Sequence, residues 1–371
     1  MSNRSTWRLL AAGIAALALL STGCEEKKPA PTPANTPAAA TKADSKPADA
    51  PKAEAPKADS TKASAPAAPA AKKSYSIGIV AKSTTNPVFQ AAKTGAFDAC
   101  AALSKEYGVE IKPIWLTPVK EDAQEQAQKI EQLVSQGVDG IAVSCTDGDV
   151  LLKPIDDAVA KGVVVVTFDS DSAKSKRMAY YGINDVACGK AIMQQLAKAM
   201  GDKGGTVAIL SGSQTAPNLN ARIQGVQDEL KALESKGFKF KKVFYTKEDP
   251  ASAVGLLQQT QSANPDISGW AMVGGWPLFT DKALDGIADK AKVVSVDTLP
   301  EQLKYVENGQ VACLIGQDCY GWGYESVRMI VEKLVKNKTP DKPINNFELD
   351  IVTKDNVANV KGRWEKWLGN K

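Results

Sequence analysis

Ser76-Ile77-Gly78-Ile79-Val80 is a short apolar run, and a helical pattern over residues 88–107 follows it. A second helical pattern covers residues 123–136. Further apolar runs lie between and after these patterns, at residues 111–115, 140–143 and 163–166. Near-continuous β-branched runs are typical of strands that are buried on both faces, as in parallel sheets covered by helices. The sequence from Tyr75 onward therefore predicts an α/β protein.

The same alternation restarts at Thr206-Val207-Ala208-Ile209-Leu210. It continues through runs at residues 242–245, 270–273, 293–296 and 311–315. About 300 residues exceed the size of one compact core of this type, so two lobes are expected. We predict two Rossmann-like lobes, each a parallel sheet covered by helices, joined by a hinge. Lobe 1 covers about residues 74–183 and lobe 2 about 204–315, with C-terminal segments crossing back.

The N-terminus has the layout of an export signal. Arg4 and Arg8 precede an apolar run at residues 9–20, and small residues lead to Cys24. The run is too short to span a bilayer comfortably. The segment resembles a bacterial lipoprotein signal, although Ser21 stands where that motif prefers leucine. We predict a signal peptide at 1–23 and lipidation of Cys24; the alternative is an ordinary cleaved signal with an incidental cysteine.

Residues 24–73 are rich in Ala, Pro and Lys and contain no aromatic side chain. Such a segment buries too little apolar surface to offset its conformational entropy, which predicts disorder. We interpret it as a tether; neutral low-complexity drift is the alternative. The first 73 residues hold eleven of the 46 basic and six of the 42 acidic residues, which leaves 35 and 36 for the rest. The folded part is thus near neutral and lacks the basic surface that nucleic-acid binding requires.

Polar and aromatic residues follow the predicted strands, at the edge where open α/β sheets bind ligands. They lie at residues 82–89, 168–171, 218–225 and 274–277, and at Asp297 and Gln317. Carboxylates and amides bind hydroxyl groups, and aromatic rings cover the C–H face of a sugar ring. With two facing lobes, the pattern predicts a polyhydroxylated ligand in the cleft between them.

Four motifs make a resemblance specific. They are Asn86-Pro87-Val88-Phe89, Thr167-Phe168-Asp169, Arg222-Ile223-Gln224-Gly225 and the interval from Asp297 to Gln317. In this order, residues 75 to about 353 resemble the ribose-type (class I) periplasmic sugar-binding proteins of ABC importers. The resemblance implies the type I periplasmic binding protein fold, with two lobes and a hinge.

The resemblance also implies which residues contact the ligand, namely Asn86, Phe89, Asp169, Asn220, Asp297 and Gln317. Ribose binders of this family carry arginines where this chain has Ser170 and Asn220, a departure that speaks against ribose itself and leaves the identity of the sugar open. Lys82 is a candidate replacement donor, or it indicates a ligand with an acidic group. Trp276 follows Gly274-Gly275 and is a candidate stacking platform.

Most of these residues also have a purely structural interpretation. Asp169, Asp297 and Asn86 could cap helices or lie in loops. Phe89 could pack in the core, and exposure would explain Lys82 and Trp276. Arg222 is expected to hold the helix and the hinge together, and Trp322 to belong to the core.

No catalytic residues, cofactor or metal site is predicted. The chain has no histidine, which removes Ser-His-Asp, Cys-His and histidine-metal arrangements. Beyond Cys24 there are five cysteines, an odd number, so at least one is free or paired between chains. A bridge between Cys313 and Cys319 is one possibility.

The functional prediction is a periplasmic or cell-surface lipoprotein, attached to the membrane through its lipid anchor. It is expected to act as a monomer that captures a monosaccharide or similar polyol and delivers it to an ABC transporter permease. The alternative is a sugar-sensing receptor whose closed form engages a chemoreceptor or sensor kinase. A repressor of related fold would need a DNA-binding helix pair where the signal and tether stand, and is rejected.

Overall fold

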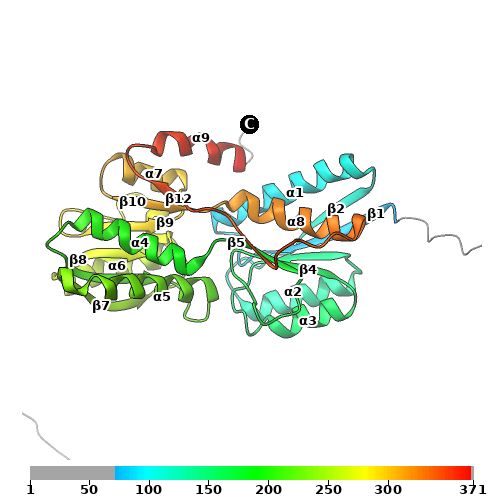
Figure 1. The fold of residues 1–371 in the computed structure, drawn as a ribbon, viewed down its shortest axis with the longest axis horizontal. Coiled ribbons are helices and arrows are strands. Elements are labelled where there is room, and N and C mark those ends of the chain that lie inside the picture. The colour runs from blue at the N-terminus through cyan, green and yellow to red at the C-terminus, as the bar shows by residue number, and fades with distance from the viewer. Residues whose placement is uncertain (1–71, 369–371) are drawn as a thin grey trace, which may run out of the picture. The chain divides into compact units, whose positions relative to one another are not determined.

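The computed structural model describes residues 72–368, which form two six-stranded sheets, each with helices on both faces (Figure 1). This arrangement confirms the predicted fold class. The predicted signal peptide at 1–23, Cys24 and all but the last two residues of the predicted tether lie outside the described residues. No helix within the described part is long and apolar enough to cross a membrane.

The first lobe has the strand order β11-β5-β4-β3-β1-β2, and all its pairs are parallel. Its strands are β1 (Ser74–Val80), β2 (Glu110–Trp115), β3 (Gly140–Val143), β4 (Val164–Phe168), β5 (Ala179–Gly182) and β11 (Ile344–Asn346). Its helices are α1 (Pro87–Tyr107), α2 (Ala123–Ser135), α3 (Leu152–Ala160) and α8 (Cys319–Lys336).

The second lobe repeats the plan, with the order β12-β10-β9-β8-β6-β7 and one antiparallel pair, β10 with β12. Its strands are β6 (Gly205–Ser211), β7 (Phe238–Tyr245), β8 (Ile267–Met272), β9 (Lys292–Val296), β10 (Cys313–Gly316) and β12 (Asp350–Val352). Its helices are α4 (Asp185–Met200), α5 (Pro217–Ala232), α6 (Pro250–Ala263), α7 (Pro300–Glu307) and the short turns η1 (Glu234–Lys236) and η2 (Trp276–Phe279). The last helix, α9 (Val357–Trp367), packs on both α1 and α7.

The sequence patterns miss three short strands and one strand start. β5, β11 and β12 have three or four residues each, too few to show a period. β7 begins at Phe238 rather than at residue 242, because its first half is an exposed edge with lysines at 239, 241 and 242. Charged side chains on an edge strand oppose pairing with another chain, so the polar pattern there is compatible with a strand.

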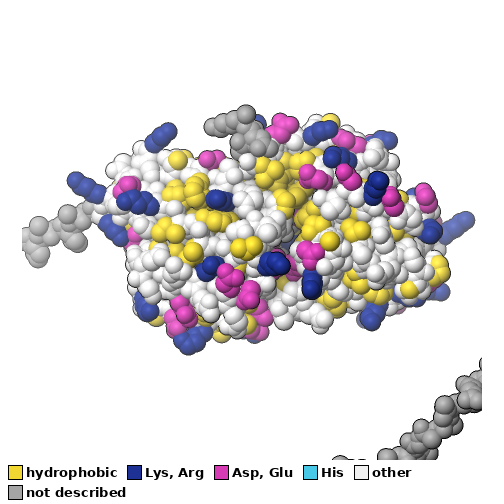
Figure 2. All heavy atoms as spheres, turned by 180° about the vertical axis from the view of Figure 1, so that it is seen from behind, with side chains coloured by type: hydrophobic (Ala, Val, Ile, Leu, Met, Phe, Trp, Pro, Cys, Tyr) yellow, Lys and Arg dark blue, Asp and Glu magenta, His cyan; other side chains and the backbone are white. Residues whose placement is uncertain are grey.

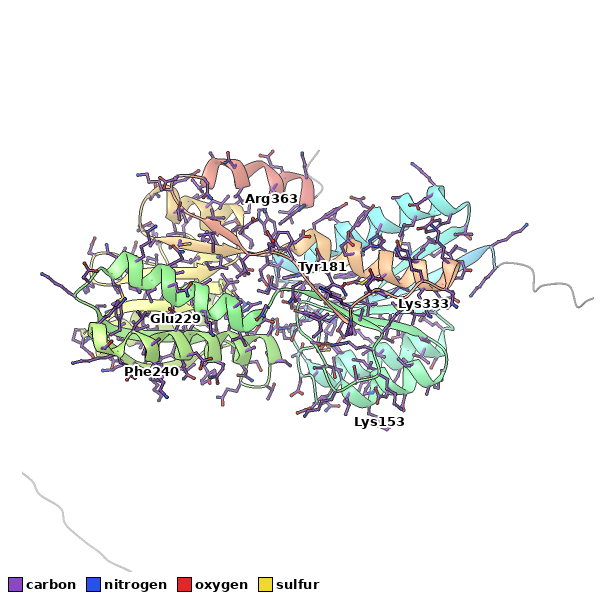
Figure 3. The ribbon with its side chains drawn as sticks, in the orientation of Figure 1. Lys153, Tyr181, Glu229, Phe240, Lys333 and Arg363 are labelled. Atoms are coloured by element: carbon purple, nitrogen blue, oxygen red, sulfur yellow. The ribbon has the colours of Figure 1, made fainter. Side chains whose placement is uncertain are left out.

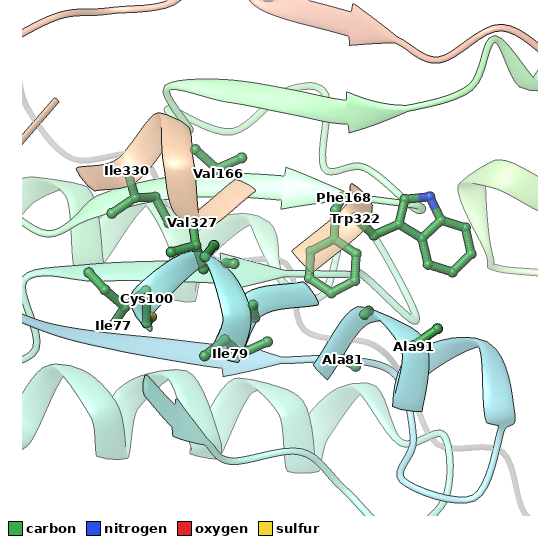
Figure 4. Packing of buried hydrophobic residues seen from close by; sticks show 14 of the residues in the cluster. Ile77, Ile79, Ala81, Ala91, Cys100, Val166, Phe168, Trp322, Val327 and Ile330 are labelled. Carbon is green, nitrogen blue, oxygen red and sulfur yellow. The ribbon is translucent and has the colours of Figure 1, made fainter. Parts of the chain in front are cut away.

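Each sheet has an apolar core on both faces. In the first lobe, α1 and α8 cover one core, in which Phe168 and Trp322 lie with ring centroids 6.4 Å apart (Figure 4). The opposite face packs against α2 and α3. The described cysteines, Cys100, Cys145, Cys188, Cys313 and Cys319, are all buried and free, so the Cys313–Cys319 bridge is not formed.

Three segments connect the lobes: β5 to α4, β10 to α8, and β11 to β12. Tyr181 lies at the first of these, midway between the lobes in Figure 3. Its hydroxyl donates to Asp318 Oδ2 at 2.9 Å, and Asp318 belongs to the second segment, where it also caps α8. The two connections therefore contact each other directly.

Glycines allow the helices of each lobe to pack very closely. A Cβ at Gly323 of α8 would stand 1.8 Å from the Ala92 carbonyl oxygen of α1. In the second lobe, a Cβ at Gly189 of α4 would stand 2.0 Å from the Arg222 carbonyl oxygen of α5. Both obstacles are backbone atoms, which cannot move without separating the helices.

We expect Gly189→Ala and Gly323→Ala each to destabilise the protein by about 1–3 kcal/mol, because an added methyl group forces the helices apart. Urea unfolding of the purified protein measures this. Gly255→Ala in α6 is the matched control, since its Cβ meets nothing within 4 Å. At Gly255 the higher helix propensity of alanine should raise the free energy of unfolding by about 0.5–1 kcal/mol. Equal effects at all three positions would contradict the packing argument.

Candidate functional site

Most of the predicted ligand residues line one cleft at the carboxyl ends of the two sheets. Of the eight predicted residues, the cleft is lined by Lys82, Asn86, Phe89, Asp169, Trp276, Asp297 and Gln317. Both lobes contribute, as expected from the strand order. Figure 2 shows one face of the molecule hollowed near its middle, with charged side chains of both signs around the hollow.

Two aspartates occupy matching positions in the two lobes. Asp169 follows β4 and Asp297 follows β9, and both have left-handed backbones, with φ of 56° and 71°. Aspartate adopts this region more readily than most residues, but at some cost in energy. Strained backbone at such sites is commonly associated with function. In both lobes the strand thus ends at an aspartate whose carboxylate is nearly buried and lines the cleft.

Lys82 and Asp169 of the first lobe meet Asn218 of the second. Asn218 Nδ2 donates to Asp169 Oδ1 at 3.1 Å, and Lys82 Nζ donates to Asn218 Oδ1 at 3.3 Å. Lys82 Nζ lies 3.9 Å from Asp169 Oδ2, which also accepts from Ser144 Oγ. Burial alone would lower the pKa of Lys82, but the carboxylates of Asp169, Glu121 and Glu248 together raise it. Lys82 is therefore a buried, charged ammonium that links the lobes.

Arg222 connects the second aspartate to the hinge. Its guanidinium donates to Asp185 Oδ1 at 2.8 Å, to the Val273 carbonyl at 3.1 Å and to Gln317 Oε1 at 2.9 Å. Gln317 Nε2 in turn donates to Asp297 Oδ1 at 2.7 Å. Asp185 begins α4 and Gln317 precedes α8, so the network joins both lobe connections.

Aromatic rings form the apolar part of the cleft. Phe89 lies with its ring centroid 6.0 Å from that of Trp322, and both line the cleft while belonging to the core. Trp276 lies against Gly274, where a Cβ would come within 2.1 Å of the indole ring. The glycine thus lets the ring fold back beside the cleft, and Trp276 is only 5 % exposed.

The structure places Asn220 outside the cleft. Its side chain is exposed and donates to the Gln214 carbonyl at 2.8 Å. Helix α5 starts at Pro217, so Asn218, Leu219 and Arg222 share the face toward the cleft, while Asn220 points away. The amide of α5 that lines the cleft is therefore Asn218.

Two acidic residues that line the cleft were not predicted from the sequence. Glu121 follows β2 and Glu248 follows β7, the edge strands of the two sheets, and both line the cleft. Burial and the neighbouring Glu248 raise the pKa of Glu121 well above its usual range, although Lys82 opposes this. Within residues 72–368, no group of three His, Cys, Asp or Glu is placed to hold a metal ion.

A family model described as a periplasmic binding protein domain matches residues 77–338. The chain belongs to this family. The resemblance inferred from the four motifs is thereby confirmed at the level of the family. The match covers the residues that line the cleft, from Lys82 to Trp322.

Curated relatives are binding proteins of the same kind. The D-allose-binding periplasmic protein of Escherichia coli K12 is 26% identical over 271 residues, covering 68% of this chain and 83% of that protein. The ribose import binding protein RbsB of Bacillus subtilis is 22% identical over 250 residues, covering 66% of this chain and 77% of that protein. Both are named as binding proteins, not as enzymes.

Solved structures give the same result. An ABC transporter solute-binding protein from Burkholderia graminis, in complex with D-arabinose, is 28% identical with a TM-score of 0.70. The alignment covers 77% of this chain and 97% of that one. A carbohydrate transporter solute-binding protein from Agrobacterium radiobacter, also with D-arabinose, is 25% identical with a TM-score of 0.70, covering 80% and 99%.

The pH dependence of stability should report the burial of Asp297. Burial raises the pKa of Asp297 to about 6 from 3.8, against the opposing effects of Arg222 and the Gln317 hydrogen bond. The native state then holds a proton that the unfolded state has already lost. The stability contributed by this group is therefore full below pH 3.8 and is lost as the pH rises to about 6.

We expect Asp297→Asn to remove this loss, which amounts to about 2–3 kcal/mol for a shift of about two pH units. The measurement is the free energy of unfolding in urea across that pH range, compared between variant and wild type. Asp266→Asn is the control, because Asp266 is a largely exposed carboxylate. Parallel pH profiles for wild type and Asp297→Asn would contradict the assignment.

Proposed function

We propose that this protein captures a monosaccharide or similar polyol in the cleft and delivers it to an ABC transporter permease. The observation that carries the proposal is the pair of strand-end aspartates facing one cleft from two lobes, together with amides and aromatic rings. Carboxylates and amides bind hydroxyl groups, and rings such as Phe89 and Trp322 cover apolar faces of a sugar. The relatives that are named for allose and ribose support a ligand of this class.

The binding mechanism follows from the connections between the lobes. A ligand that contacts both Asp169 and Asp297 interacts with both lobes only when they are closed, so it shifts the population toward the closed form. The closed form then presents a defined surface to the permease. We propose import rather than sensing because relatives are named as import binding proteins. The role is binding without chemistry.

A panel of pentoses, hexoses and polyols should contain a ligand that raises the thermal midpoint of the purified protein. At about a thousand times its dissociation constant, a ligand adds roughly 4 kcal/mol to the folded state, which corresponds to several degrees. Asp169→Asn should weaken that ligand by about 10- to 100-fold, the usual worth of a hydrogen bond to a charged group. Asp266→Asn should not. A panel without any stabilising compound would refute a neutral sugar or polyol ligand.

We further propose that the chain works outside the cytoplasm as an anchored lipoprotein. In this proposal residues 1–23 are the signal peptide, Cys24 carries the lipid, and the segment 24–73 spaces the binding domain from the membrane. The export layout around Arg4, Arg8 and Cys24 supports it. Relatives named as periplasmic proteins support an extracytoplasmic location.

Mass spectrometry of the protein purified from membranes of a bacterial host should detect a mature N-terminus at Cys24 with an attached diacylglycerol. Cys24→Ser should abolish the modification and release the protein from the membrane fraction, because one thioether-linked lipid is the only anchor in this proposal. A mature N-terminus elsewhere, without lipid, would support the ordinary cleaved signal instead.

A further inference from the structure

Glu121 and Glu248 meet across the cleft from opposite lobes. Each lies in the loop after an edge strand, β2 in the first sheet and β7 in the second. Both side chains line the same cleft, and the Glu248 carboxylate helps to raise the pKa of Glu121. Two carboxylates in one cleft repel each other unless a proton or another positive charge neutralises them. The electrostatic cost of closing the lobes around Glu121 and Glu248 therefore depends on which group neutralises their charges.

The local structure holds both carboxylates in place. Glu248 Oε1 accepts a hydrogen bond from the Ser213 backbone N–H at 2.8 Å. Gly212 makes room for it, since a Cβ there would stand 2.5 Å from Glu248 Cγ. Glu121 Oε2 is buried and has no hydrogen-bond donor within residues 72–368. A buried carboxylate oxygen without a donor is costly, so this atom is suited to a donor on the ligand.

The charges of the cleft favour a cation. Its lining contains the carboxylates of Asp169, Glu121, Glu248 and Asp297, against the cations Lys82 and Arg222. Arg222 is already paired with Asp185, and Lys82 is linked to Asp169 through a 3.9 Å ion pair and through Asn218. Within residues 72–368, neither Glu121 nor Glu248 forms an ion pair with these two cations, and Lys82 acts on both only at longer range. An acidic ligand, one reading of Lys82 from the sequence, would add a further negative charge to this set.

We propose that the ligand is an amino sugar or amino polyol whose protonated amine binds between Glu121 and Glu248. This deepens the proposed function and rests on it. An ammonium group brings three N–H donors and one positive charge, which suits two carboxylates that share one space. A hydroxyl group brings one donor and no charge, and so leaves one of the two carboxylates uncompensated. The hydroxyl groups of the same ligand bind at the Asp169 and Asp297 ends of the cleft.

The test compares matched ligands by isothermal titration calorimetry at a pH where the amine is protonated. The probes are D-glucosamine, D-galactosamine and D-mannosamine, each with its parent hexose and its N-acetyl derivative. We expect at least one amine to bind about ten-fold or more tightly than its parent, as charge-assisted hydrogen bonds require. N-acetylation, which removes the charge, should abolish that advantage.

Variants locate the effect. Glu121→Gln and Glu248→Gln keep the shape of the side chain and should each reduce the ratio of amine to parent affinity by about ten-fold. Glu106→Gln on α1 is the control, because Glu106 is an exposed carboxylate in a surface ion pair, and it should leave the ratio unchanged.

The outcomes separate this inference from the proposed function. If a neutral sugar of any kind binds at least as tightly as every amine, the amine subsite is refuted and the sugar-binding function stands. If an amine is preferred but the ratio of amine to parent affinity is unchanged in Glu121→Gln and Glu248→Gln, the subsite is also refuted. If no sugar, polyol or amino sugar binds, the proposed function itself fails.

Discussion

The buried guanidinium of Arg222 connects the fold to the site. A charge at 3 % exposure is tolerated only when its donors are paired. Here the partners are Asp185 at the start of α4, the Val273 carbonyl after β8, and Gln317 before α8. Because Gln317 also donates to Asp297, the same chain of hydrogen bonds orients a cleft carboxylate and spans two of the three lobe connections. Displacing any member leaves a buried polar group unpaired, which makes this part of the molecule intolerant of local rearrangement.

Close helix packing complements this polar network. The contacts at Gly323 and Gly189 bring helix backbones together on one face of each sheet, and such close packing resists deformation within a lobe. The three connecting segments are then the places where relative motion of the lobes is expected. Since Asp169 and Asp297 lie at strand ends of different lobes, their separation changes when the lobes rotate, while their local geometry does not. Ligand binding can therefore change the shape of the molecule through lobe closure alone.

The sequence predicted the features that depend on local patterns, and failed where the three-dimensional arrangement decides. Apolar runs located the long strands, and strand-end positions located Asp169 and Asp297. Asn220, predicted to contact the ligand, lies outside the cleft. Which face of α5 turns toward the cleft depends on how the helix packs, although the four-residue spacing of Asn218 and Arg222 does place those two on one face. Glu121 and Glu248 had no signal at all: each is an ordinary loop acid, and only the pairing of residues 127 positions apart gives them a role.

The distribution of charge within the cleft implies that a ligand binds in one orientation. At one end, Gln317 donates to Asp297 and accepts from Arg222, so this network offers a ligand both acceptors and donors. At the other, Glu121 and Glu248 approach as like charges, and Lys82 is already committed to Asp169 and Asn218. Because the two glutamates line one cleft from different lobes, closure must accommodate both of them whatever the ligand is. A neutral ligand must therefore leave a proton on the pair, whereas a cationic ligand replaces that proton, so the electrostatic cost of closure itself discriminates between ligands.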